Sequence, residues 1–443
     1  MKRQNLTKAL SLIMAATMTL SLAACGSKDS SDGSGDGSGA SGQTTISLYT
    51  TIPGKDAEFE ALCEEFMEAN PDIKVDYIAY DSSEKQKWMT LYSSGQAPTV
   101  SIMDAVDIIQ NSENLLPLDS SELTFMNQID QSYVDVYKGA DGQVYGIPNS
   151  VQAMGILYNK TTIEEATGET FDPSTIKTRD DLIALCDKIQ AGGVAPLMLT
   201  GVDWSLGSHF LSQVFTGIRG GAEEQEAFIE SVKAGEVDLK NDEAWNNVMD
   251  TFDVFAKYNY NSNDPLVGNT DIDGQTMTSG KAAMWFMGDW GWSYLESTAD
   301  PEDEYGIMPV PLTNNADDAI NQQLGVFPAK GYCIDASQST EEQQAAAKKF
   351  VEFLCLGNQQ AMADLLAVAL PFADADVEYT SPVIASTQSY IQSGNTYSTY
   401  AFSLLLPSDF WSENGATMQQ YLVGQCDRDT AADAIQAYWQ AQS

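Results

Sequence analysis

The order of elements that decides the fold begins at residue 44 with the stretch TTISLY (44–49), in which apolar and polar side chains alternate. Such alternation predicts a half-buried β-strand. A second alternating stretch spans residues 73–78, and a third strand is predicted over residues 97–104. Helical patterns precede and follow the second strand, one ending at Asn70-Pro71 and one covering residues 83–94. This β-α-β-α-β order predicts an α/β fold with a mainly parallel sheet and helices on both faces.

The rest of the chain repeats this theme with less regularity. Helices are predicted over residues 179–190, 244–257, 341–356 and 431–440, and short strands over residues 155–158, 282–286, 305–309 and 330–334. Thr340 and Gln343 have the spacing of a capping box at the start of the third of these helices. A single hydrophobic core stops growing at about 250–300 residues. Because the body runs from residue 43 to residue 443, we expect two lobes.

The first residues have the features of a secretion signal followed by a lipid anchor. Basic side chains within the first eight residues precede an apolar run over residues 9–24. This run is shorter than the ~20 residues that span a bilayer, so it predicts a signal peptide rather than a transmembrane helix. It ends in LAAC (22–25), which resembles the lipobox of bacterial lipoproteins. We therefore expect a signal peptide over residues 1–24 and a lipid on Cys25, as in palmitoylated lipoproteins; an ordinary signal peptide with a chance cysteine is the alternative.

A low-complexity segment follows the predicted anchor. Residues 26–42 are almost entirely Gly, Ser, Asp and Ala. Such a composition cannot bury enough apolar surface to fold and forms a flexible tether. Residues 25–43 are therefore predicted to hold the folded body outside the cytoplasmic membrane, on its outer face, with the lipid as the only membrane contact.

The charge of the chain excludes several classes of partner. Lys and Arg total 22 against 63 Asp and Glu, which gives a net charge of −41. A surface of this sign repels nucleic acid and anionic lipid headgroups. A hydrophobic content of 43% with 10% aromatic residues also excludes a disordered acidic protein.

The sequence lacks the motifs of common hydrolases and metal sites. The six cysteines are widely spaced with no CxxC pair, and no HExxH motif or serine nucleophile elbow occurs. The single histidine, His209, is expected to have no catalytic role. Asp271 and Asp273 lie at the start of a calcium-loop spacing, but its twelfth position is Gly280 instead of a bidentate glutamate. No enzyme activity, cofactor or metal is therefore predicted, and calcium near these two aspartates stays an open alternative.

Four stretches resemble one known family, in the order in which that family has them. They are DGQVYGIP (141–148) with YNK (158–160), GKAAM (280–284) with GDW (288–290), YGI (305–307) with Pro309 and Pro311, and the helix with Ala346, Lys348, Phe350, Phe353 and Leu354. These are similar to segments of the extracellular solute-binding proteins of family 1, a group of maltose-binding-protein-like receptors. The second stretch is the most specific of the four. With the strand at residue 44, the resemblance covers essentially the whole body.

The resemblance implies a two-lobed periplasmic-binding-protein fold of type II. Each lobe is expected to be a mainly parallel sheet flanked by helices, with strands that cross a hinge between them. Lobe 1 is expected to comprise residues 44–150 and about 322–369, and lobe 2 residues 151–321 and about 370–443. In such folds the ligand binds in the cleft between the lobes, outside the carboxyl ends of the strands, and hinge closure buries it.

The function that the resemblance implies is capture of a carbohydrate, expected to be an oligosaccharide, for an ABC importer. The partners would be the transmembrane subunits of the permease, and the receptor is expected to be a monomer. Alternatives are the same fold with a polyamine or other cationic solute boxed by aromatic rings, a secreted glycosidase, and an adhesive surface lipoprotein.

Aromatic candidates for the ligand site follow from the resemblance, because sugars present flat C–H faces to aromatic rings. Trp290 ends the GDW stretch, where the family has a tryptophan that often stacks on ligand. Trp204, and either Phe410 or Trp411, occupy places similar to stacking aromatics in a maltose-binding member. Phe327 or Tyr332 is expected to reach the cleft from residues 325–332, and either ring is equally compatible with the core.

Polar candidates are Asp104, Asp289 and Gln152. Asp104 ends a predicted strand, where the family often has a carboxylate that accepts from two adjacent hydroxyls. Gln152 matches an acidic ligand contact of a maltose-binding member, and the amide here puts the same ligand geometry in doubt.

Overall fold

The computed structural model describes residues 43–52, 55–79, 84–328, 330–407 and 409–442. The predicted signal peptide, Cys25 and the tether up to residue 42 lie outside these residues. Residues 43–443 form one compact unit. In its described part, no helix is long and apolar enough to cross a membrane.

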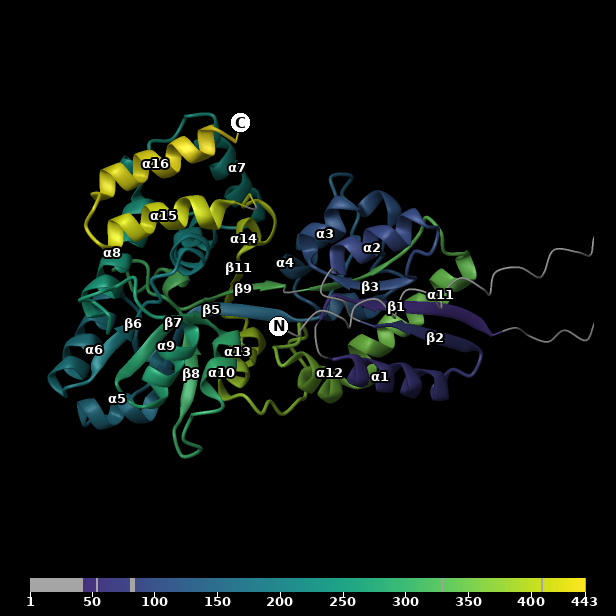
Figure 1. Ribbon diagram of the computed structural model, residues 1–443, viewed down its shortest axis with the longest axis horizontal. Helices are drawn as coiled ribbons and strands as arrows, with labels where there is room; N and C mark the ends of the chain where they lie inside the picture. Colours follow the sequence, from purple (N-terminus) through teal and green to yellow (C-terminus); the bar gives the residue numbers. More distant parts are fainter. Residues whose placement is uncertain (1–42, 53–54, 80–83, 329, 408, 443) are drawn as a thin grey trace, which may run out of the picture. The chain divides into compact units, whose positions relative to one another are not determined.

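Two mixed sheets, each flanked by helices, organise this unit (Figure 1). The first has the order β2 (Ile73–Ile78), β1 (Thr44–Thr50), β3 (Val100–Met103), β10 (Gly331–Ile334), β4 (Ile147–Pro148). The second has the order β11 (Thr396–Ser398), β9 (Leu324–Pro328), β5 (Val151–Asn159), β7 (Ala282–Gly288), β6 (Ala195–Met198), and β8 (Tyr305–Met308) also pairs with β5. The predicted two-lobed α/β architecture is confirmed.

One strand in each sheet runs against all the others. In the first sheet β10 is antiparallel to β3 and β4, while β2, β1 and β3 are parallel. In the second sheet β5 is antiparallel to β7, β8 and β9. The outer strands are parallel to their neighbours, β11 to β9 and β6 to β7. The chain enters β5 directly from β4, and β10 directly from β9. The reversed strand is thus the one that arrives from the other sheet, which is the hinge-crossing pattern that the resemblance implies.

The helices follow the amphipathic patterns of the sequence. Their bounds are α1 Asp56–Ala69, α2 Glu84–Ser93, α3 Ala105–Gln110, α4 Gln131–Val134, α5 Lys160–Thr167, α6 Arg179–Ala191, α7 Ala222–Lys233, α8 Glu243–Tyr258, α9 Thr270–Thr278, α10 Trp292–Leu295, α11 Glu341–Glu352, α12 Gln359–Leu366, α13 Pro382–Gln392, α14 Tyr400–Leu404, α15 Phe410–Leu422 and α16 Arg428–Gln440. α1 buries Phe59, Leu62, Cys63 and Phe66. The predicted capping box of Thr340 and Gln343 opens α11.

The return to the first sheet comes later than the sequence suggests. The predicted boundary at about residue 322 would assign Leu324–Pro328 to lobe 1, but β9 pairs with β5 and β11 of the second sheet. The chain joins the first sheet only at Gly331, where β10 begins. A continuously apolar stretch does not by itself tell which sheet it joins, because β9 and β10 are both buried along their whole length.

The core spans both sheets. One apolar cluster contains Leu48 and Phe350 near the first sheet together with Trp285 and Val326 of the second. A further cluster fills the second lobe alone. The third lies on the first sheet, around Tyr49, and the partly buried Tyr400 and Leu404 of α14 pack against it. The five cysteines of the described part form no disulfide, and Cys426 is the least buried of them.

Candidate functional site

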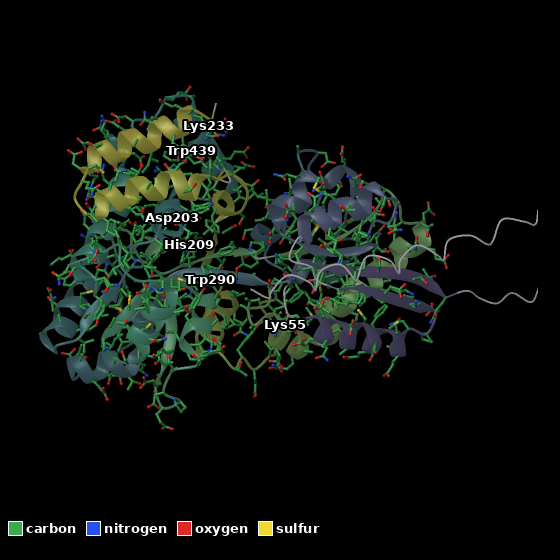
Figure 2. The ribbon with its side chains drawn as sticks, viewed as in Figure 1. Lys55, Asp203, His209, Lys233, Trp290 and Trp439 are labelled. Carbon is green, nitrogen blue, oxygen red and sulfur yellow. The ribbon has the colours of Figure 1, made fainter. Side chains whose placement is uncertain are left out.

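Five aromatic side chains form a connected group, here called the aromatic cluster: Trp204, His209, Trp290, Phe327 and Phe402. His209 lies at its centre. Its ring centroid is 5.1 Å from that of Trp204 and 5.2 Å from that of Trp290, both edge to face. Figure 2 shows His209 and Trp290 next to one another. Burial lowers the pKa of His209 to about 4, so the ring is neutral near pH 7 and the cluster carries no charge.

A π-helical segment, Trp204–Phe210, carries the first two of these rings. Its N-cap Asp203 accepts a hydrogen bond from the Trp204 amide. Gly207 lets the segment touch the backbone of α15, since a Cβ there would lie 2.5 Å from the Trp411 carbonyl oxygen. Gly415 does the same from the other side, because its Cβ would lie 2.5 Å from the Asp203 carbonyl oxygen.

Trp290 is held at the end of β7 by the glycine two residues before it. β7 ends at Gly288, and the chain turns through Asp289–Gly291. A Cβ on Gly288 would come within 2.0 Å of the Trp290 ring. The ring therefore lies folded back on the Gly288 backbone, which explains why the sequence has glycine at the first position of GDW.

The remaining two rings come from elements that the linear sequence separates widely. Phe327, on β9, lies 6.0 Å from Trp290 and 4.9 Å from Phe402, measured between ring centroids. Phe402 lies on α14, the helix whose Tyr400 and Leu404 pack against the third apolar cluster on the first sheet. α14 thus connects the aromatic cluster of the second lobe with the first.

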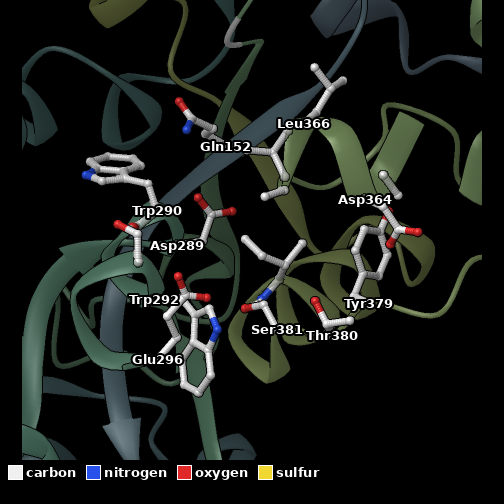
Figure 3. Close-up of a pocket in the computed structure, with 15 residues that line it drawn as sticks. Gln152, Asp289, Trp290, Trp292, Glu296, Asp364, Leu366, Tyr379, Thr380 and Ser381 are labelled. Atoms are coloured by element: carbon white, nitrogen blue, oxygen red, sulfur yellow. Dashed lines mark hydrogen bonds between the residues drawn. The ribbon is translucent and has the colours of Figure 1, made fainter. Parts of the chain in front are cut away.

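A pocket of about 290 Å³ adjoins Trp290, and Figure 3 shows the side chains around it. Gln152, Asp289 and Trp290, three of the predicted ligand residues, line it together. Trp292 at the start of α10 and Tyr379, before α13, contribute aromatic surface. The pocket combines polar side chains with aromatic and aliphatic walls, which is the usual make-up of a small-molecule site.

Asp289 is fully buried in this pocket, at 0% exposure. The Thr387 hydroxyl donates to its Oδ2 at 3.1 Å. Its Oδ1 has no hydrogen-bond partner in the described part of the chain. Burial raises the pKa of Asp289 to about 7, and the Thr387 hydroxyl and nearby backbone amides oppose this rise only in part.

Asp104 lies at the end of β3, in the first lobe, where the sequence predicts it. It caps α3 by position and forms an ion pair with Lys330, with Oδ1 2.7 Å from Nζ. Lys330 stands at the crossing between β9 and β10. Asp104 does not line the pocket beside Trp290. The pair places one acceptor and one donor at the edge of the first sheet.

The structure corrects two predicted aromatic contacts. Tyr332 is 1% exposed, because β10 is central in its sheet and its ring packs in the first apolar cluster. Phe410 is also 1% exposed and packs against Phe215 and Trp439. Neither ring is accessible to a ligand. Trp411, the other aromatic of that pair, is 42% exposed at the start of α15.

Sequence reasoning missed two members of the cluster, His209 and Phe402. His209 was expected to be a helix or loop residue without a catalytic role and was not predicted to contact ligand, and no pattern singles out Phe402 in YAFSLLLP. The only signal was indirect: a lone histidine close to Trp204, which the sequence did identify. No hydrogen bond to the His209 ring is found within the described residues, so nothing there resembles a catalytic triad.

The two aspartates with calcium-loop spacing lie on a helix. Asn269 caps α9 by accepting from the Ile272 amide, and Asp273 is buried with its Oδ2 2.6 Å from the Thr200 hydroxyl. Burial raises the pKa of Asp273 to about 6. The described residues contain no group of three or more His, Cys, Asp or Glu side chains that could hold a metal ion.

The family described as "Bacterial extracellular solute-binding protein" matches residues 49–355. The chain belongs to this family. A multiple sugar-binding protein of Streptococcus mutans is 26% identical over 344 residues, which are 75% of this chain and 74% of that protein. An uncharacterized ABC transporter extracellular-binding protein of Pyrococcus horikoshii is 26% identical over 273 residues. That match spans 59% of each chain, so the chain covers less than two thirds of this relative's length.

Solved structures share the fold. A family 1 extracellular solute-binding protein of Bifidobacterium longum subsp. infantis has a TM-score of 0.70 at 22% identity, covering 90% of this chain and 100% of that one. The apo form of RafE from Streptococcus pneumoniae has a TM-score of 0.73 at 18% identity, with 91% and 99% covered. RafE in complex with raffinose has a TM-score of 0.64 at 18% identity, with 90% and 99% covered.

Proposed function

We propose that this protein is the carbohydrate-binding component of an ABC importer. The observation that carries the proposal is the neutral aromatic cluster around His209, with Trp290 beside a pocket that contains Gln152 and Asp289. Aromatic rings bind the C–H faces of sugars, and a few polar groups orient their hydroxyls. The sugar-binding relatives in Streptococcus mutans and the raffinose complex of RafE support the same ligand class.

The proposed ligand residues differ in how they would act. Trp290 and Trp204 would stack on the sugar, while Gln152 and Asp289 would bond its hydroxyls. Asp104 and its partner Lys330 would do so from the first lobe after closure. Phe327 would act mainly by holding Trp290, since it is 9% exposed, and the exposed Trp411 would extend the stacking surface.

The membrane attachment is also part of the proposal. Cys25 would carry the lipid, and residues 26–42 would let the body reach the permease subunits from the outer face of the cytoplasmic membrane. We propose a monomer without enzymatic activity. Mass spectrometry of membrane-extracted protein should find acyl groups on Cys25, whereas Cys25→Ala protein should be released into the medium. Recovery of unmodified wild-type protein from the medium would contradict the anchor.

A thermal-shift panel tests the ligand class. A ligand at 100 times its Kd adds ~2.7 kcal/mol to the free energy of unfolding. Mono- and oligosaccharides, polyamines and amino acids should be compared, and chromatography should check that each carbohydrate survives incubation. Stabilisation by an intact carbohydrate is expected. Stabilisation by amino acids alone would contradict the proposal, and hydrolysis of the carbohydrate would favour the glycosidase alternative.

A further inference from the structure

The pocket beside Trp290 is acidic. Asp289 forms part of its buried interior, and the exposed Glu296 and Asp364 stand where it opens. These two come from different elements, since Glu296 follows α10 and Asp364 belongs to α12. None of the residues that line the pocket is a lysine, arginine or histidine. Asp104, which does not line the pocket, does have a cationic partner, since it forms an ion pair with Lys330.

Asp289 is left incompletely satisfied although it is fully buried. Its Oδ1 has no hydrogen-bond partner in the described part of the chain. Leaving a buried acceptor unpaired destabilises the folded protein. Asp335, also buried at 1% exposure, differs because it accepts from the amides of Ser337, Gln338 and Ser339. The buried Asp273 resembles Asp289 in having an unpaired Oδ1, but it does not line the pocket. Asp289 is one of the residues that line the pocket, so a ligand that reaches its carboxylate can supply the missing donor.

Two aromatic side chains complete the surroundings. Figure 3 shows Trp292 and Tyr379 on different sides of the pocket. Tyr379 is fixed in place, because its hydroxyl accepts from the Leu370 amide and donates to Gln388 Oε1, both at 3.1 Å. Trp292 packs edge to face against Tyr305, with centroids 5.4 Å apart. Aromatic rings near carboxylates attract cations through their π faces.

We infer that this pocket receives an ammonium group carried by the ligand, so that the preferred substrate class is an aminated carbohydrate. The inference rests on the proposed carbohydrate function. An ammonium has three donors and no acceptor, and ionised carboxylates only accept, so the two match without an unused group. A neutral hydroxyl can also be bound here, for example by the Gln152 amide, but it carries no positive charge to offset the carboxylates. Metal binding is not favoured, because the described residues contain no cluster of three suitable ligands.

The test compares matched ligands by isothermal titration calorimetry at physiological ionic strength and near neutral pH. The ligands are a neutral oligosaccharide, its analogue with one hydroxyl replaced by an amine, and spermidine as a free polyamine. The wild-type protein should bind the amine at least about tenfold more tightly than the neutral analogue, which corresponds to 1.4 kcal/mol. Distant surface charges contribute little, because the Debye length is about 8 Å at this ionic strength.

Two variants locate the effect. In Glu296→Gln/Asp364→Asn protein, the ratio of the two Kd values should fall to within about twofold, the scatter expected of uncoupled sites. Glu302→Gln is the matched control, because this exposed glutamate in the same lobe does not line the pocket. It should keep the full preference for the amine. Far-UV circular dichroism and the melting temperature check that the double variant is folded.

The outcomes distinguish the ammonium pocket from the proposed carbohydrate function. Equal affinity for the neutral and aminated sugars overturns the inference and leaves the carbohydrate function standing. An amine preference that survives both in the double variant and in Asp289→Asn protein also overturns it, because none of the three carboxylates of the pocket is then its source. Tight binding of spermidine with no binding of any carbohydrate supports the ammonium pocket and overturns the carbohydrate function. If none of the three ligands binds, both the ammonium pocket and the carbohydrate function are overturned.

Discussion

The aromatic cluster and the acidic pocket meet at Trp290 and yet have opposite chemistry. The cluster consists of rings packed edge to face around His209, whose pKa is lowered to about 4 by burial. The pocket contains three carboxylates, and burial raises the pKa of Asp289 to about 7. In both places burial disfavours the charged form. In the cluster this gives a neutral surface; in the pocket it leaves an acid that a cationic ligand can compensate.

Because of this difference in charge, we expect the aromatic cluster to determine ligand affinity and the acidic pocket to determine ligand selectivity. The cluster offers flat apolar area that binds any sugar face, so it should contribute most of the binding energy. The pocket offers few contacts but a definite charge, and electrostatic complementarity mainly governs which ligand is chosen. Variants of the two regions should therefore have different effects on a panel of ligands.

The largest effect is expected from Trp290→Ala, which removes the ring that both regions share. Affinity for every carbohydrate ligand should fall at least about 100-fold, as for other buried aromatic anchors, which corresponds to ~2.7 kcal/mol. Calorimetry measures the loss, and Trp290→Phe should recover part of it. The apo melting temperature is the control, since a large drop there would show that Trp290 is a core residue instead.

Asp289→Asn should change stability with a clear dependence on pH. The folded pKa of about 7 lies above the ordinary aspartate value of 3.8. Between these values the folded state binds more protons than the unfolded one, so this group lowers stability as pH rises from about 4 to 7. Without ligand, the variant should therefore be more stable than wild type at pH 8, by about 2 kcal/mol, and not at pH 4. Urea unfolding at both pH values measures this, and a gain that is the same at both would contradict the assignment.

Gly288→Ala displaces Trp290 without removing it. The added Cβ would lie 2.0 Å from the ring, so the indole must move. Affinity for carbohydrate should fall about tenfold, or 1.4 kcal/mol. Gly221→Ala is the control, because its Cβ meets only the end of the Glu224 side chain. If the two variants bind equally well, the orientation of Trp290 does not matter for binding.

A smaller effect is expected from His209→Phe, which keeps a ring at the centre of the cluster. Affinity should change by less than about tenfold, since the surface stays aromatic. The folded pKa of about 4 lies below the ordinary histidine value of 6.5, so wild-type His209 adds stability as pH rises from about 4 to 6.5. The variant should lose this rise, which has the opposite sign to the slope from Asp289. Melting curves across this range show whether it does.

The smallest effect is expected from Tyr332→Phe. Its ring is 1% exposed in the core, so affinity should stay within about twofold of wild type. A tenfold loss measured by calorimetry would show that β10 contributes to the ligand site after all.

The sequence predicts the fold well where a periodic pattern carries it. The alternation at residues 44–49 and 73–78 and the helix that ends before Asn70-Pro71 all recur in the structure. It does less well where every side chain of a strand is apolar. All of β9 and β10 is buried, so nothing in their sequences tells which rings face a ligand or which sheet they join. This is why Phe327 joins the cluster and Tyr332 does not.

The candidate site could be predicted only in part, for a similar reason. Trp290, Asp289 and Gln152 lie close to family motifs, and the structure brings all three to one pocket. Phe402 and His209 reach the cluster through tertiary packing of α14 and of the π-helical segment, which leaves no local signal in the chain. The acidic surroundings of the pocket also arise from segments far apart, since Glu296 and Asp364 meet only in the folded protein.

The central claim is that a carbohydrate binds against Trp290, between the aromatic cluster and the acidic pocket. A crystal structure of the protein with an oligosaccharide from the thermal-shift panel tests it most directly. We predict a sugar ring whose face lies on the Trp290 indole, with a hydroxyl or amine within hydrogen-bond distance of Gln152 or Asp289. A bound sugar that leaves Trp290 untouched and occupies another part of the molecule would contradict the account.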